Sequence, residues 1–192
     1  TYVSQIIAGD DNGSRTVGVA FDAELVGIRR GFGSDGSVQD IVDAFVHARV
    51  NDFDIINSSW GNNVAFGDNT KIDFISTDTS AITAEFENLA NLGRDGLGAN
   101  IVFSAGNLRA AGQSSNYKNY QNSPYTITVG AIAEDGTYAL FSDAGSNLLV
   151  TAPGDNLLVS NPNDVNSANV ISGTSFSAPA VSGVIALMLE AN

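Results

Sequence analysis

Hydrophobic and polar positions alternate along the chain in two distinct patterns, one typical of strands and one typical of helices. Short runs of β-branched and other apolar residues, bounded by Gly, Asn, Asp or Pro, predict strands. Such runs occupy 24–29, 54–58, 101–104, 126–132, 138–141 and 148–151. Helical patterns separate the earlier runs, which indicates a parallel sheet covered by helices.

Apolar residues three or four positions apart predict three amphipathic helices. The first lies at about 1–8, and the second lies at about 38–50, where Ser37 is a natural N-cap. The third runs through 82–89 and ends at Gly93. Strands and helices in this order predict an α/β fold with a mostly parallel sheet, and 192 residues suit a single domain.

The last predicted helix, 175–189, differs from the others because it is apolar on every face. A helix of this kind is expected to be buried on all sides. Pro179 is compatible with the helix because it falls in the first turn, where its missing N–H costs little. The segment is therefore predicted to lie in the core of the domain.

The composition excludes several classes of function. The chain has 8 Lys and Arg against 21 Asp and Glu, a net charge of −13, and only two of its residues are Lys. Because no basic stripe could neutralise phosphates, nucleic acid is not an expected partner. No apolar run approaches the ~18–20 residues needed to span a bilayer, so insertion into a membrane is not expected either.

Two rare residue types limit the chemistry further. The absence of Cys excludes disulfides, thiolate metal sites and Cys nucleophiles. The chain has one His, so a mechanism that needs a histidine base must use His47 or a group outside this chain. His47 lies on the polar side of its predicted helix, one turn after Asp43, an arrangement typical of exposed surface pairs. We therefore do not expect His47 to act as a base.

A glycine-rich loop at Gly31–Gly36 matches the G-x-G-x-x-G pattern of dinucleotide-binding sites, between a predicted strand and a predicted helix. Such a site also needs an acidic residue at the end of the next strand, and the segment 56–59 has none. Asp35 would also bring negative charge to a pyrophosphate. A glycine-rich turn is the favoured interpretation, and nucleotide binding stays the weakest of three functional alternatives.

Ser175 is the strongest candidate for chemistry. It lies in the motif Gly-Thr-Ser-Phe-Ser-Ala-Pro, at 173–179, immediately before the apolar helix. The unpaired N–H groups of a first helical turn favour negative charge beside them, which suits a nucleophilic serine. A Ser or Thr at a helix start is also commonly an N-cap. The residues alone leave both interpretations open, because the sequence shows no base for Ser175.

The motif at 173–179, followed by Val-Ser-Gly at 181–183, resembles the serine motif of subtilisin-like proteases, and 186–192 resembles the kexin/furin branch of that family. Further segments resemble the family in the same order: 56–61, 93–98, 104–107, 119–125, 141–142 and 152–154. The resemblance implies a subtilisin-like three-layer sandwich with a mostly parallel central sheet and a buried central helix after the catalytic Ser. It also implies that 1–192 is the C-terminal portion of a single subtilase catalytic domain.

The resemblance assigns roles to individual residues. Ser175 is implied to be the nucleophile, and Asn107 to donate its side-chain amide to the oxyanion, assisted by the Ser175 backbone N–H. The implied substrate-binding residues are Ser59, Trp60, Gly61, Ser104, Ala105 and Gly106. Without Ser175, Asn107 would be interpreted as part of a Gly-Asn turn, which is common after strands.

The catalytic His and Asp of the family are expected upstream of this chain. Residues 1–4 and 6–9 resemble the stretch that follows the family's His-Gly pair. The upstream segment, carrying His and Asp, is therefore an expected partner of this segment in one active site. On its own, the segment is expected to be inactive, because Ser175 lacks its base.

A calcium site is also implied by the resemblance. The loop 10–19 resembles the family loop that wraps Ca²⁺, with Asn12 as a side-chain ligand and Asp10, Ser14 and Thr16 as carbonyl ligands. Oxygen-only ligation suits a hard cation. Arg15 argues against the site, and the alternative is an acidic, solvated turn.

The resemblance implies a secreted serine endopeptidase of the kexin type that hydrolyses peptide or protein substrates. The alternative is a non-catalytic module with the same fold that binds peptides. Kexin-like enzymes recognise basic residues through carboxylates soon after Ser-Trp-Gly, whereas the first acid after Gly61 is Asp68. The net charge of −13 favours basic peptides but builds no pocket, so dibasic specificity is not expected from the sequence.

Overall fold

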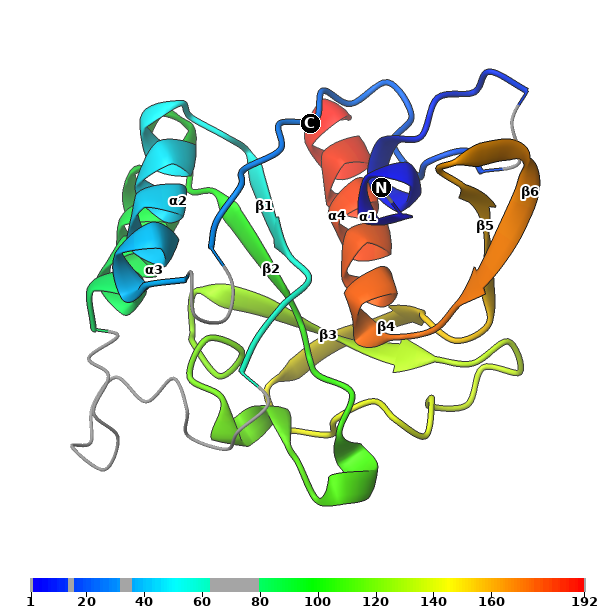
Figure 1. The fold of residues 1–192 in the computed structure, drawn as a ribbon. Helices are drawn as coiled ribbons and strands as arrows, with labels where there is room; N and C mark the ends of the chain where they lie inside the picture. The colour runs from blue at the N-terminus through cyan, green and yellow to red at the C-terminus, as the bar shows by residue number, and fades with distance from the viewer. Residues whose placement is uncertain (1, 14–15, 32–35, 63–79, 192) are drawn as a thin grey trace.

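A computed structural model describes residues 2–13, 16–31, 36–62 and 80–191 (Figure 1). The helices are α1 (Tyr2–Ala8), α2 (Val38–Val50), α3 (Ser80–Leu92) and α4 (Thr174–Glu190). The strands are β1 (Ile55–Ser58), β2 (Asn100–Ser104), β3 (Thr126–Ile132), β4 (Leu148–Pro153), β5 (Leu157–Asn161) and β6 (Asp164–Ile171). Short 3-10 helices in the connections are η2 (Arg94–Gly96), η3 (Arg109–Ala111) and η4 (Ser115–Tyr117).

The first four strands form one parallel sheet in the order β1-β2-β3-β4. In this register Ser58 of β1 lies opposite Phe103 of β2, and Ser104 lies opposite Val129 of β3. The carboxyl ends of β1 and β2 therefore meet at the same edge, where parallel sheets usually carry their binding sites. The segments that follow these two strands emerge side by side.

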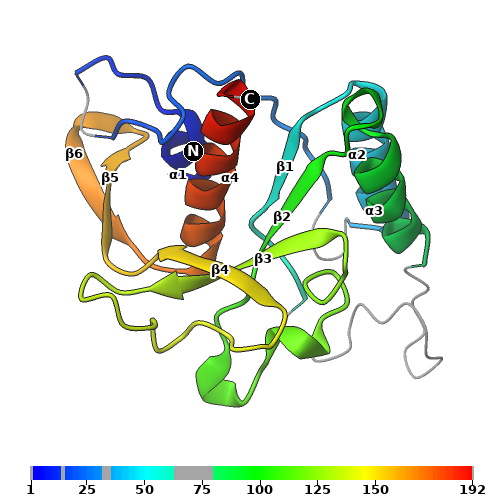
Figure 2. The same ribbon diagram turned by 180° about the vertical axis from the view of Figure 1, so that it is seen from behind.

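Alternate side chains of β2 point to opposite faces of the sheet and divide the core in two. Ile101 and Phe103 pack in a cluster with side chains of α2 and α3, whereas Val102 packs with Ala178 of α4. Both ribbon views place α2 and α3 on one side of the sheet and α4 with α1 on the other (Figure 2). The predicted three-layer α/β sandwich with a mostly parallel sheet is confirmed.

The second helix begins at its predicted cap. The Ser37 hydroxyl accepts a hydrogen bond from the Asp40 N–H at 3.0 Å, and the Asp40 carboxylate accepts one from the Ser37 N–H at 2.7 Å. This capping box satisfies two N–H groups that a helix start leaves unpaired. The hydrogen bond from the Ser37 backbone, supported by the Ser37 hydroxyl, holds the pKa of Asp40 below its usual value.

Two predicted strands are wrong. Segment 24–29 runs beside β1 without pairing to any described residue, and Val26, Ile28 and residues of β1 line a cavity of about 140 Å³. A strand needs a hydrogen-bonded neighbour, and no described residue supplies one to this segment. Segment 138–141 contributes only an isolated bridge, between Tyr138 and Ile132.

The antiparallel pair β5 and β6 was not among the predicted strands. Strand β6 reads Asp-Val-Asn-Ser-Ala-Asn-Val-Ile, and Asp and Asn are depleted in strands. The apolar run at 157–159, followed by the turn-forming pair at 162–163, is the signal that indicates this hairpin.

The helix α4 is the central helix of the domain, but its burial changes along its length. Its buried residues all lie in the first ten positions: Thr174, Ser177, Ala178, Pro179, Ser182 and Gly183. Val184 and Met188 are 49% and 64% exposed, so the expectation of burial on all sides is wrong for the last turns. The sheet and α1 cover two sides of α4 and leave a third to solvent. In the described part of the chain, no helix is long and apolar enough to cross a membrane.

Candidate active site

Ser175 lies in the first turn of α4 and is not its N-cap. The cap is Gly173, whose φ of 149° lies in the region that favours glycine, and no side chain caps the helix. The Ser175 hydroxyl donates to the carbonyl oxygen of Ser59 at 3.3 Å. The start of α4 therefore meets the segment that follows β1, and the hydroxyl is free of a capping role.

The side chain of Asn107 is fixed against the start of α4. Its Oδ1 accepts hydrogen bonds from both the backbone N–H and the hydroxyl of Thr174, each at 2.8 Å. Its Nδ2 lies 3.4 Å from the position that a Cβ would take on Gly173. Because both hydrogen bonds engage the oxygen end of the amide, the nitrogen end is left facing the backbone beside Ser175.

Thr174 links the start of α4 to the turn after β2, since it bonds to both Gly106 and Asn107. Its side chain is fully buried, and its hydroxyl accepts from the Gly106 N–H at 3.1 Å while donating to Asn107. Thr174 was not among the predicted site residues. The hydroxyl immediately before Ser175 in the Gly-Thr-Ser motif is the signal that could have identified it.

Two N–H donors next to a serine hydroxyl can stabilise a tetrahedral oxyanion. The Ser175 backbone N–H and the Asn107 Nδ2 donate no hydrogen bond to any residue that the structure describes, so both can serve a ligand. Preorganised donors of this kind stabilise charge that develops in a transition state. The arrangement suits acyl transfer at Ser175.

The predicted substrate-binding residues come from two neighbouring segments, which follow β1 and β2: Ser59, Trp60 and Gly61, and Ser104, Ala105 and Gly106. Gln121 connects these segments. Its Nε2 donates to the Ser104 carbonyl at 3.1 Å and lies 2.6 Å from where a Cβ on Gly61 would be. A side chain at position 61 would collide with the amide of Gln121, so the glycine allows this close approach. Gln121 was not among the predicted site residues.

The indole of Trp60 belongs to the aromatic cluster on the α2 and α3 side of the sheet. Its ring centroid lies 5.3 Å from that of Phe103 and 5.8 Å from that of Tyr120. The Arg30 guanidinium lies 4.0 Å from the centre of the indole, and burial of this group lowers its pKa. Packing with these side chains holds the ring of Trp60, which stays partly exposed.

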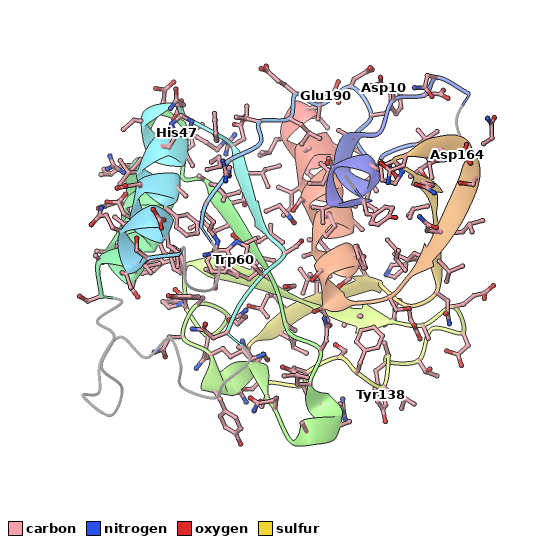
Figure 3. The ribbon with its side chains drawn as sticks, in the orientation of Figure 1. Asp10, His47, Trp60, Tyr138, Asp164 and Glu190 are labelled. Carbon is pink, nitrogen blue, oxygen red and sulfur yellow. The ribbon has the colours of Figure 1, made fainter. Side chains whose placement is uncertain are left out.

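His47 lies on α2, in the outer helical layer (Figure 3). Its Nδ1 is 3.2 Å from the Asn51 Nδ2, and its ring contacts Phe53 edge to face. The helix α4, which carries Ser175, lies on the opposite side of the sheet. Within the described residues, the chain thus brings Ser175, Asn107 and Ser59 together without a histidine.

The predicted calcium loop closes on itself at the opposite end of α4 from Ser175 (Figure 1). The Gly18 N–H donates to the Gly9 carbonyl at 2.8 Å, and the Thr16 carbonyl lies 3.2 Å from where a Cβ on Gly9 would be. Thr16 also exchanges two hydrogen bonds with Ser160 of β5, at 2.7 and 3.1 Å. The Thr16 carbonyl, one of the predicted ligands, thus lies close to Gly9, and an oxygen ligand of this kind suits a hard cation.

Parts of two predicted sites lie outside the described residues. These parts are Ser14 of the predicted calcium loop and positions 32–35 of the Gly31–Gly36 loop. Asp10 and Asn12, the remaining predicted ligands, are described and exposed. The described residues contain no group of three or more His, Cys, Asp and Glu side chains that could hold a metal, so a site in this loop would rely on carbonyl and amide oxygens.

Two relatives are similar to this chain over 98% of its length. The proprotein convertase subtilisin/kexin type 6 of Rattus norvegicus is 32% identical, and furin of Homo sapiens is 33% identical. The chain spans 20% of the first protein and 23% of the second.

Two solved structures share the fold. A cold-adapted subtilisin-like serine proteinase is 25% identical with a TM-score of 0.74, over 99% of this chain and 60% of that protein. A protease of Pseudoalteromonas arctica is 26% identical with a TM-score of 0.77, over 100% of this chain and 58% of that protein. A sequence profile of the subtilase family matches residues 1–192, and the chain therefore belongs to the subtilase family.

Proposed function

We propose that this chain is the C-terminal portion of the catalytic domain of a serine endopeptidase of the kexin type. The observation that carries the proposal is the contact between Asn107 and Thr174, which leaves two N–H donors beside the Ser175 hydroxyl. The kexin branch is supported by the names of the relatives at 32% and 33% identity. Substrates would be peptides or proteins.

In the proposed mechanism, the Ser175 Oγ attacks the scissile carbonyl carbon and gives its proton to a histidine upstream of Thr1. The carbonyl oxygen becomes an oxyanion that accepts hydrogen bonds from Asn107 Nδ2 and the Ser175 N–H. As this intermediate collapses, the histidine gives the proton to the leaving nitrogen, so that the amine is released and an acyl ester stays on Ser175. Water, deprotonated by the same histidine, then hydrolyses the ester and restores the Ser175 hydroxyl. An upstream Asp would orient the histidine.

The second candidate is a non-catalytic module that binds peptides. It is favoured by one observation: the only His of the chain, His47, lies on the other side of the sheet from α4. A fluorophosphonate probe distinguishes the two, because it reacts only with an activated serine. Labelling of the full-length protein that disappears in Ser175→Ala supports the enzyme. A folded protein that stays unlabelled supports the module.

We also propose that the loop around Asn12 binds a structural Ca²⁺ and that the protein is secreted. Asp10, Ser14 and Thr16 would supply carbonyl oxygens. The bound ion would be attracted to these oxygens and would hold the loop against β5. Because an ion that binds only the folded state stabilises it, a chelator should lower the melting temperature of the full-length protein. Asn12→Ala should reduce this shift, and Asn163→Ala, on the β5–β6 turn, should leave it unchanged.

A further inference from the structure

A buried ion pair lies directly behind the turn that carries Asn107. The Nζ of Lys118 is 2.6 Å from Oδ2 of Asp143, and the two side chains are 2% and 0% exposed. Lys and Asp are almost never buried this completely unless they are paired. The pair joins η4 to the segment before β4 and touches none of the residues that the sequence suggested as catalytic.

The ion pair bonds to the backbone on both sides of Asn107. Oδ1 of Asp143 accepts from the Leu108 N–H at 2.8 Å, and the Asp143 N–H donates to the Gly106 carbonyl at 2.9 Å. The Nζ of Lys118 donates to the Ala105 carbonyl at 3.4 Å. Three neighbours of Asn107 in the turn, residues 105, 106 and 108, are thus attached to one buried pair.

Gly106 is the point of closest contact between the turn and the ion pair. A Cβ on Gly106 would lie 2.2 Å from the Lys118 Nζ and 2.3 Å from the Asp143 Oδ2, and its φ is +115°. Any side chain at this position would displace the pair. The backbone of the turn therefore rests against the two charged groups with no intervening atom.

The energetics of buried ion pairs argue against a purely stabilising role. Desolvation offsets most of the attraction, so replacing such a pair by apolar residues of similar volume is often neutral for stability. A pair that bonds to the backbone on both sides of Asn107 is therefore better explained by the geometry that it gives the turn than by a gain in stability.

We propose that Lys118 and Asp143 are positioning residues, which hold the turn 105–108 so that the Asn107 amide meets the oxyanion. This inference rests on the proposed peptidase function. The Asn107 side chain is fixed at its outer end by Thr174, and the ion pair fixes the backbone from which that side chain projects. Oxyanion stabilisation depends on donors that are oriented before reaction.

The test is the double variant Lys118→Met/Asp143→Leu in the full-length protein. We expect a folded protein with a lowered melting temperature, because the Leu108 N–H and the Ala105 carbonyl lose their partners, together with a kcat lowered at least tenfold and a KM changed less than threefold. A kcat loss without a KM change is the signature of an interaction made only in the transition state. A kcat within twofold of the wild type, in a folded variant, overturns the proposal.

A matched control is the ion pair between Arg49 and Glu85, which joins α2 to α3 at 2.9 Å on the other side of the sheet. Arg49→Met/Glu85→Leu should leave kcat unchanged. A further variant tests the route of the effect: in an Asn107→Ala background, loss of the Lys118 and Asp143 pair should lower kcat no further, because both changes remove the same donor. An additive loss contradicts the proposal.

Two measurements keep the inference separate from the proposed function. If the wild type shows neither turnover nor fluorophosphonate labelling, the peptidase function fails. Hydrogen exchange at the Leu108 N–H then tests the positioning contact, with at least tenfold faster exchange expected in the double variant and unchanged exchange overturning it. If the double variant does not fold, Asp143→Asn replaces it, with a kcat loss of threefold or more expected and no loss overturning the proposal.

Discussion

The two halves of the candidate site differ in how firmly they are held. On the amide side, Asn107 is fixed by Thr174 and the turn below it is fixed by a buried ion pair. On the hydroxyl side, Ser175 Oγ has a single hydrogen bond, at 3.3 Å to the carbonyl of Ser59. The half proposed to stabilise charge is thus built from residues of this chain, whereas the half proposed to transfer the proton needs a base that the described residues do not bring to Ser175.

The largest expected effect concerns the hydroxyl side. Ser175→Ala in the full-length protein should lower kcat by about 10⁶-fold, the size of the loss in subtilisin, a member of the same family. Hydrolysis of a peptide amide substrate measures it. Ser146→Ala, at an exposed serine, should have no effect. Activity retained in Ser175→Ala would show that another residue is the nucleophile. The comparison between the amide side and the hydroxyl side would then no longer hold.

The amide side should give the next largest effect. Asn107→Ala should lower kcat by about 10²- to 10³-fold with little change in KM, a range that comes from subtilisin, a member of the same family. Steady-state kinetics separate the two constants. An increase in KM at constant kcat would show that Asn107 binds the substrate itself and not the oxyanion.

Thr174 should contribute less than the donor it orients. Thr174→Val keeps the shape of the side chain but removes the hydroxyl that bonds to Gly106 and Asn107. Since a net hydrogen bond contributes about 1 kcal/mol, and 1.4 kcal/mol corresponds to tenfold, loss of the bond to Asn107 should lower kcat about fivefold. Thr174→Ser, which restores the hydroxyl, should recover most of the activity, and failure of this rescue would point to packing.

The smallest effect is expected outside both halves of the site, at the capping box of α2, and it concerns the stability of the fold. Hydrogen bonds from Ser37 lower the pKa of Asp40 in the folded protein, so the ionised carboxylate stabilises the fold above the unfolded pKa of about 3.9. This contribution is lost as the pH falls through the lower, folded pKa. Urea midpoints of wild type and Asp40→Asn should therefore differ at pH 7 and converge in acid. Asp22→Asn, at an exposed carboxylate, should give equal midpoints throughout.

Sequence patterns predicted the parts of this molecule that depend on neighbours along the chain. Ser37 caps α2 as predicted, and the apolar positions Ile82, Phe86 and Leu89 of α3 are all fully buried. The order of motifs placed Ser175 and Asn107 in one site, although 67 residues separate Asn107 from its partner Thr174. Local periodicity was enough to predict the cap and the buried positions, and the family resemblance was enough to bring Ser175 and Asn107 together.

Contacts between distant segments could not be predicted in this way. Lys118 and Asp143 are 25 positions apart, and nothing in either local sequence indicates burial or pairing. Segment 24–29 has the composition of a strand, but whether it pairs depends on the distance to β1, which composition does not encode. Gln121 was missed for the same reason, because its role depends on the approach of Gly61.

The cavity beside β1 also has a practical consequence for handling the protein. Among the described residues β1 pairs with β2 alone, so its other edge carries backbone groups without a strand partner, and an unpaired strand edge is a common template for association between chains. The net charge of −13 opposes such contacts by repulsion between molecules, and salt screens that repulsion. A preparation of this segment alone should therefore stay dispersed in dilute buffer and form higher oligomers as the ionic strength rises.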